Sequence, residues 1–237
     1  KNMFTITSIS TSFVFLFFLL VGSKVYHSWR KEKSPLLKFF VIFLLSFGFQ
    51  QLFFSLGSGL VSSSSQVNVM LWAVAHIFMF IGISYFILLP VSLKIPRLEK
   101  LIFRIAIGLS VIGIAIIFLN TPITRGELLP NNVYLFIVPA MSGAVIGIFT
   151  TICLIFSFIV ILSGSRQTKN RLLKARALFL AFGVLIFLIG GPMHNFVKGP
   201  GMTFLADILI VIGAFLMVLG VYIPKIFGQG KTINQAK

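Results

Sequence analysis

The chain has 237 residues, of which 58% are hydrophobic and only 10% are charged, and its net charge is +16. A water-soluble domain needs about a quarter of charged residues to cover its surface, so this composition excludes a soluble globular protein. The basic excess does not indicate nucleic-acid binding, because most basic residues fall in short connections between apolar segments. We therefore expect a multi-pass membrane protein in contact with the lipid bilayer and without nucleic acid as a partner.

Seven apolar runs are each long enough to cross the hydrocarbon core of a membrane as a helix. They cover about residues 4–26, 37–60, 69–89, 101–119, 133–162, 175–196 and 204–223. Backbone groups in lipid must be hydrogen-bonded internally, and no run alternates like a strand of a membrane barrel, so each run is predicted to be a helix. The connections are short, which predicts one all-α integral membrane domain over residues 1–237.

The basic residues predict the orientation of the helices. Of the 20 lysines and arginines, only Lys1, Arg125 and Lys198 fall on one side of the predicted membrane. The others lie in the connections after the first, third and fifth runs and after the seventh run. By the positive-inside rule the N-terminus is outside and the C-terminus is cytoplasmic, which predicts a multi-pass protein of the cell membrane. The cytoplasmic connections are expected to attract anionic lipid headgroups.

Two segments of the chain resemble each other. Residues 75–82, AHIFMFIG, align without gaps on residues 206–213, ADILIVIG, and shorter matches precede them at 36–38 with 172–174 and at 47–48 with 182–183. Both triplets of helices would start on the same side of the membrane, so the alignment predicts a parallel 3+1+3 repeat. In such a repeat His76 and Asp207 occupy equivalent positions.

Polar residues of four runs fall at one depth, near the outer surface. Asn68, Trp72 and His76 follow an i, i+4, i+8 spacing and share one helix face. Ionisable groups at membrane depth are costly and usually functional. We therefore expect His76, His194 and Asp207 to point into a pocket in the outer half of the bundle. The remaining side chains predicted to line this pocket are Gln50, Gln51, Asn68, Trp72 and Asn195.

Other roles for these side chains stay open at this point. His194 and Asp207 lie close enough to the interface to cap helix ends or to pair with each other. His76 could hydrogen-bond an amide or a carbonyl of a neighbouring helix. Trp72 could be an interfacial anchor.

The stretch of residues 190–207 suggests a cofactor. It contains His194 and Asp207 together with Met193 and Met202. Histidine with methionine is a ligand set for copper and for haem iron. The first hypothesis is therefore a membrane protein that binds haem b or a metal, with His76 and His194 as axial ligands and with Met193, Met202 and Asp207 as further metal ligands. Such a protein could be an electron-transfer subunit.

Other function classes remain as alternatives. No nucleophile with a neighbouring base is found, so we expect no enzyme beyond a redox subunit. A retinal Schiff base is excluded, because no lysine lies between Lys198 and Lys225. The second hypothesis is a sensor or receptor-like module that signals through a protein partner bound to residues 166–176. A small transporter and an accessory subunit of a membrane complex complete the alternatives.

Overall fold

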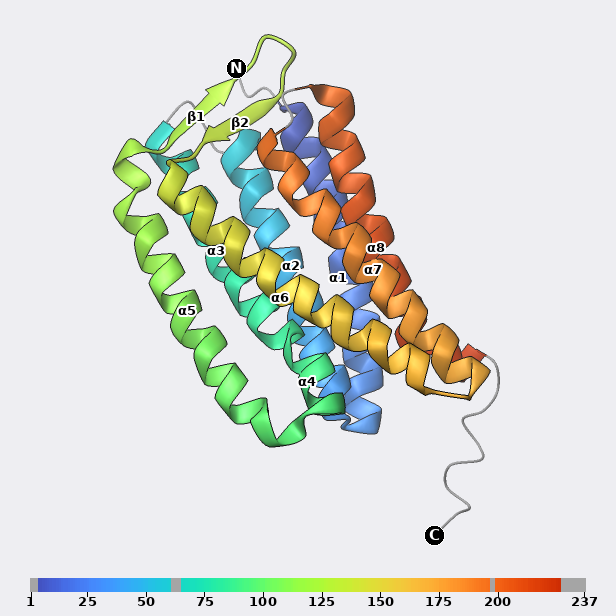
Figure 1. Cartoon of the computed structure of the whole chain (residues 1–237). Coiled ribbons are helices and arrows are strands. Elements are labelled where there is room, and N and C mark those ends of the chain that lie inside the picture. The colour runs from blue at the N-terminus through green and yellow to red at the C-terminus, as the bar shows by residue number, and fades with distance from the viewer. Residues whose placement is uncertain (1–3, 61–64, 197–198, 227–237) are drawn as a thin grey trace.

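The computed structural model describes residues 4–60, 65–196 and 199–226 (Figure 1). Its long helices are α1 (Ile6–Glu32), α2 (Pro35–Ser55), α3 (Ser65–Phe86), α5 (Glu99–Leu119), α6 (Ala140–Gln167), α7 (Arg171–Phe196) and α8 (Pro200–Ile226). A short helix, α4 (Leu88–Lys94), extends α3, and short η turns cover Leu56–Leu60, Pro96–Leu98 and Thr121–Ile123. Within the described residues, seven helical spans are long and apolar enough to cross a membrane. The predicted multi-pass helical protein is confirmed at this level.

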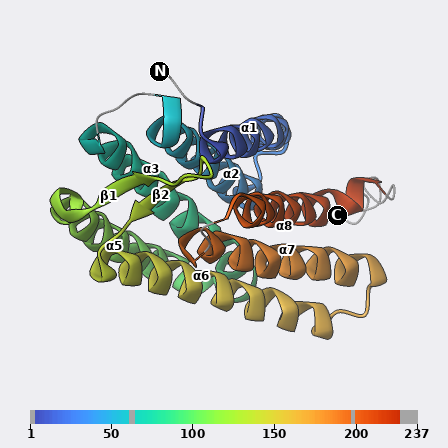
Figure 2. The same cartoon turned by 90° about the horizontal axis from the view of Figure 1, so that it is seen from above.

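The helices are arranged as a ring in chain order. Each long helix packs on the next one from α1 to α8, and α8 returns to pack on α1. The view from above shows α8 between α1 and α7, and α5 and α6 on the side away from α1 (Figure 2). The first and last helices of the chain are therefore neighbours, although their sequences lie about 200 residues apart.

Local sequence signals explain where the first two helices begin and end. The Thr5 hydroxyl caps α1 by accepting a hydrogen bond from the backbone N–H of Ser8 at 3.0 Å. At the other end Lys33 adopts a left-handed conformation with φ 54°, and its N–H bonds the Trp29 carbonyl at 2.7 Å. Pro35 then starts α2 at a position where its missing N–H costs nothing.

One predicted helix begins later than expected. The apolar run of residues 133–162 contains a strand, β2 (Tyr134–Ile137), before α6 begins at Ala140. β2 pairs antiparallel with β1 (Arg125–Leu128), and Arg125 lies opposite Ile137. Pro139 separates the strand from the helix as its N-cap. A short apolar run is compatible with either structure, so the sequence pattern alone did not separate strand from helix.

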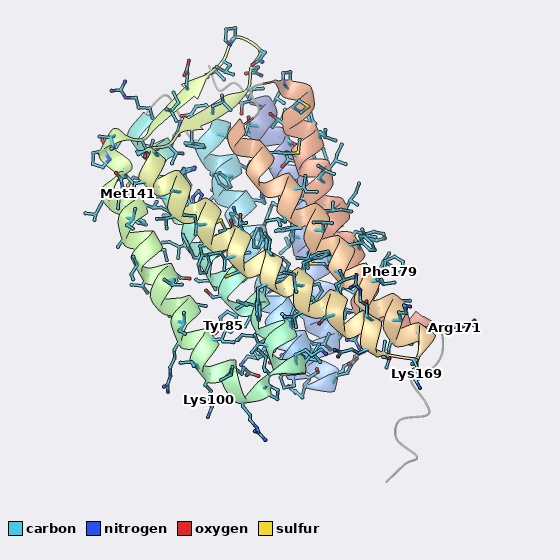
Figure 3. All side chains as sticks on the ribbon, viewed as in Figure 1. Tyr85, Lys100, Met141, Lys169, Arg171 and Phe179 are labelled. Atoms are coloured by element: carbon cyan, nitrogen blue, oxygen red, sulfur yellow. The ribbon has the colours of Figure 1, made fainter. Side chains whose placement is uncertain are left out.

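The two ends of the bundle differ in character. The β-hairpin covers one end, which we call the hairpin end, beside the first turns of α1 and α8. The opposite end carries exposed basic side chains, among them Lys100, Lys169 and Arg171 (Figure 3), and we call it the basic end. Between the two ends the outer surface is apolar. Many large hydrophobic side chains of α5 and α6 are exposed there, as expected of a surface in contact with lipid.

An aromatic cluster joins the two halves of the ring. Phe187 of α7 is buried, and its ring centroid lies 4.9 Å from that of Phe47, 5.6 Å from that of Phe43 and 6.4 Å from that of Phe18. These edge-to-face contacts link α7 to α1 and α2 in the middle of the bundle.

Small residues bring α7 and α8 into backbone contact. Gly183 and Gly190 on α7, and Ala206, Gly213 and Gly220 on α8, repeat every seven residues. A Cβ atom added at Gly213 would meet the backbone N of Phe187 at 2.7 Å and the carbonyl oxygen of Gly183 at 2.8 Å. Small residues allow this close approach of membrane helices. Because Ala206 faces α7, the next residue, Asp207, is turned toward α1.

Candidate functional site

Asp207 and Ser10 form a buried polar pair between α8 and α1. Each side chain is 3% exposed, and the Ser10 hydroxyl donates a hydrogen bond to the Asp207 carboxylate. A second link between the same helices lies at the basic end, where the hydroxyls of Ser28 and Tyr222 are 2.7 Å apart. The two helices are thus held together by hydrogen bonds near both ends.

A groove opens between these two links. It has a volume of about 340 Å³ and is lined from α1 by Ser10, Phe13, Val14 and Phe17, and from α8 by Phe204, Asp207, Ile208, Val211 and Ile212. On both helices the lining residues follow the i, i+3, i+4, i+7 pattern of a single face. Phe13, Ile208 and Ile212 are exposed on the outer surface, so the groove opens sideways on the outside of the bundle. Ser10, Val14 and Asp207 are buried and form its floor.

Hydroxyl side chains bind the start of α1 to the end of α2. The Thr5 hydroxyl donates to the carbonyl of Ser58 at 2.7 Å, and the Ser55 hydroxyl donates to the carbonyl of Ser8 at 2.9 Å. The hydroxyls of Ser12 and Ser55 are 2.6 Å apart. The Ser58 carbonyl lies in the last turn of the second span, where the helix changes to a π-helical turn, and the Ser8 carbonyl lies in the first turn of α1. These bonds also fix the position of Ser10 on the opposite face of α1.

His76 belongs to a separate cluster on α3. Its ring is 5% exposed and lies 4.3 Å from the Trp72 ring and 5.5 Å from the Phe54 ring, measured between centroids. The Nδ1 atom is 2.8 Å from the Trp72 carbonyl oxygen. Because a carbonyl oxygen only accepts, Nδ1 carries the proton in this hydrogen bond.

The hairpin covers this cluster. The Phe136 ring of β2 lies 6.0 Å from the Trp72 ring and 6.3 Å from the Phe54 ring. The Asn68 amide donates to the Tyr134 hydroxyl at 3.0 Å. The predicted face of Asn68, Trp72 and His76 is therefore directed at β2.

Gln50 and Gln51 are both buried on α2. Within the described residues, neither side-chain carbonyl oxygen has a hydrogen-bond partner. Gln50 lies one helical turn before Phe54 of the His76 cluster, and Gln51 lies one turn before Ser55 of the hydroxyl cluster. Both glutamines therefore lie one helical turn nearer the middle of α2 than the His76 cluster and the hydroxyl cluster.

The structure distributes the predicted pocket residues over two places. Asp207 lines the groove between α1 and α8, whereas His76, Trp72 and Asn68 lie beneath the hairpin. Of the two methionines, Met193 is partly buried and Met202 is 45% exposed. His194 and Asn195 belong to α7, but their side chains lie outside the described part of the chain. No group of three or more His, Cys, Asp or Glu side chains suited to a metal ion occurs among the described residues.

Two contributions were not anticipated from the sequence. Ser10 was overlooked, although the stretch TITSISTS at residues 5–12 is unusually rich in hydroxyls for a membrane helix. Tyr134 and Phe136 were assigned to a transmembrane helix rather than to the hairpin over His76. Tyr134 and Phe136, followed by Pro139, were the signal in the sequence that could have indicated a strand here.

Comparison of the sequence with models of known protein families found no match, and no curated protein matched it significantly.

Proposed function

We propose that this protein is a membrane sensor or receptor-like module that binds a small amphiphilic molecule in the groove between α1 and α8. The observation that carries this proposal is the buried Ser10–Asp207 pair on the floor of an apolar groove that opens to lipid. Ligand sites are typically apolar cavities of about 300–1,000 Å³ with a few placed polar groups, and this groove meets that description. A buried carboxylate inside a membrane span is also the residue type for which function is the default explanation.

The basic end is the proposed site for a protein partner and for anionic lipid headgroups. The connection between α6 and α7 carries exposed Arg166, Lys169, Arg171 and Lys174. α8 runs from the groove to the basic end. A ligand that changes the packing of α1 on α8 would therefore also move the end of α8 at the basic end. We also propose that the basic end is cytoplasmic, as the positive-inside rule predicts for the cell membrane.

Single cysteines test this orientation in a Cys153→Ala background. A cysteine at Arg125, which is exposed in β1, is expected to react with a membrane-impermeant maleimide added to intact cells. Cysteines at Lys33 and Lys169 are expected to react only after the membrane is opened. The reverse pattern of labelling would overturn the proposed orientation. All three positions are exposed in the structure, so differences in burial do not explain a difference in labelling.

Native mass spectrometry of the purified protein tests the proposed groove. We expect a bound amphiphile that is retained by the wild type and lost from Ile208→Trp, because an indole at Ile208 fills the groove. Ile105→Trp is the matched control, since Ile105 is 53% exposed and Ile208 51%, but Ile105 lies on α5 away from the groove. Equal retention by both variants would contradict the proposal.

Haem b is a second candidate, favoured by the orientation of His76. A histidine that ligates a metal usually donates its second ring nitrogen to a carbonyl or carboxylate, and His76 donates Nδ1–H to the Trp72 carbonyl. A second axial ligand would come from His194 or Met193 on α7. Copper held by Met202 and Asp207 is less well supported, because Asp207 binds Ser10 and Met202 is exposed. The absorption spectrum of the same purified sample distinguishes the two candidates. A Soret band that is lost in His76→Ala supports haem. If the wild type shows no Soret band, haem is excluded and the groove ligand is the remaining proposal.

The parallel 3+1+3 repeat stays a prediction. It is supported by two matched glycines that both face the preceding helix of their triplet. Gly82 lies against Ser46 and Phe47 of α2, and Gly213 lies against Gly183 and Phe187 of α7.

A further inference from the structure

The connection from α4 to α5 carries exposed apolar side chains among its basic ones. Leu93 is 62% exposed, Leu98 43% and Leu101 53%. They lie beside exposed basic residues, which are Lys94, Arg97, Lys100 and Arg104. This mixture is typical of a segment at a membrane surface, because apolar side chains enter the acyl layer while basic side chains reach the head groups. The connection therefore fits contact with a lipid better than contact with a soluble anion.

α5 continues this arrangement into the membrane span. Leu101, Ile105 and Leu109 are all exposed and follow the i, i+4, i+8 spacing of one helix face. Lys100 and Arg104 are four residues apart and share the neighbouring face at the basic end. A lipid chain can therefore lie along the exposed apolar face of α5 while its head group reaches Lys100 and Arg104.

A second basic connection meets the first one at this place. The Lys94 ammonium donates a hydrogen bond to the side-chain oxygen of Gln167 at the end of α6, 73 residues further along the chain. A Cβ atom added at Gly164 of α6 would lie 3.7 Å from Cε of Lys94. Arg166, which directly precedes Gln167, is exposed. Because the acceptor of this hydrogen bond is a neutral amide, the contact brings basic residues of both connections together without neutralising the ammonium.

We propose that the basic end binds a lipid whose head group carries two or more phosphate groups. The phosphates lie at what we call the two-connection site, which consists of Lys94, Arg97, Lys100, Arg104 and Arg166. The acyl chains follow the exposed apolar face of α5. The proposal rests on the anionic lipid contact of the proposed function and names its head group, but it does not depend on the groove between α1 and α8.

Charge complementarity favours more than one phosphate group. Residues 94–104 and 166–174 contain a single acidic residue, Glu99, which is half-buried and accepts a hydrogen bond from the Ser92 hydroxyl. Arginines predominate in the two-connection site, and a guanidinium binds two phosphate oxygens at once. A lone phosphodiester with one negative charge would leave most of these cations without a counter-charge. Two phosphate monoesters bring about three to four negative charges at neutral pH.

Native mass spectrometry of the full-length protein in detergent measures the head-group preference. The probes are phosphatidylcholine, phosphatidylserine and phosphatidylinositol bisphosphate, all with the same dioleoyl chains. We expect the bisphosphate lipid to bind with an apparent affinity about tenfold or more above that of phosphatidylserine, as additional charge-assisted hydrogen bonds imply. Inositol trisphosphate, which is the head group without chains, should bind more weakly than the lipid, because it buries no apolar surface against α5.

A pair of substitutions tests the position of the site. Arg97→Gln combined with Arg166→Gln removes one cation from each connection and should lower the affinity for the bisphosphate lipid about tenfold or more. Arg30→Gln combined with Lys31→Gln is the matched control, because it removes the same charge from exposed residues of α1, on the side of the bundle away from α6 (Figure 2). The control should leave the affinity nearly unchanged. All four residues are exposed, so both variants should melt close to the wild type.

The outcomes separate this proposal from the proposed function. Equal affinities for phosphatidylserine and the bisphosphate lipid would overturn the phosphorylated head group and leave the anionic lipid contact of the basic end. Equal affinities for all three lipids would overturn both. Inositol trisphosphate that binds as tightly as the lipid would show a site for a soluble anion and contradict the lipid. An equal loss of affinity in the two variant pairs would contradict the two-connection site.

Discussion

Gly213→Leu will separate α7 from α8 and lower the free energy of unfolding by more than about 3 kcal/mol, beyond the usual cost of overpacking. A Cβ atom at Gly213 would meet backbone atoms of Phe187 and Gly183 at 2.7 and 2.8 Å. Backbone atoms within a helix cannot rotate away as a side chain can, so the two helices must move apart. Gly183 and Gly190 on one helix and Gly220 on the other make similar close contacts, so the whole interface depends on this distance.

Thermal melting of the purified protein in detergent measures this effect. Gly147→Leu is the control, because a Cβ atom at Gly147 on α6 meets no atom within 4 Å. Both changes place the same side chain in a membrane helix. If the two variants melted at the same temperature, the close packing of α7 on α8 would be wrong. Loss of this packing would also displace Asp207 from Ser10, so Gly213→Leu should lose the bound amphiphile as well.

Phe187→Ala will destabilise the bundle by about 2–3 kcal/mol, the cavity part of the cost of removing a buried aromatic side chain. Phe187 contacts the rings of Phe18, Phe43 and Phe47 and connects α7 with α1 and α2. Inside a membrane the hydrophobic effect does not drive helices together, so these contacts contribute chiefly through van der Waals packing. The alanine variant leaves a cavity that the surrounding rings cannot fill completely.

Phe182→Ala on the same helix is the matched control, because Phe182 is 51% exposed and faces outward. We expect its melting temperature to stay close to that of the wild type. Phe187→Leu should fall between the two, since leucine fills part of the volume. Equal melting temperatures of Phe187→Ala and Phe182→Ala would contradict the central position of Phe187.

Several features followed from residue order alone. The seven spans were predictable because a helix needs about 20 apolar residues to cross the hydrocarbon core, and this length is local information. The shared face of Asn68, Trp72 and His76 was predictable for a similar reason, since helical periodicity places residues four apart on one side. Ala206, Gly213 and Gly220 recur every seven residues and so share one face of a helix. Asp207 directly follows Ala206, so its side chain lies beside that face.

Only the tertiary structure decided what these residues touch. Ser10 and Asp207 are 197 residues apart in the chain and meet because the ring of helices closes with α8 on α1. The segment of residues 134–137 became a strand rather than a helix because β1 lies beside it and supplies the hydrogen bonds. Asp207 faces α1, and His76 faces Phe54 of α2. Composition and spacing therefore determine that a helix forms and which side of it is polar, whereas the partner of that side depends on the packing of distant segments.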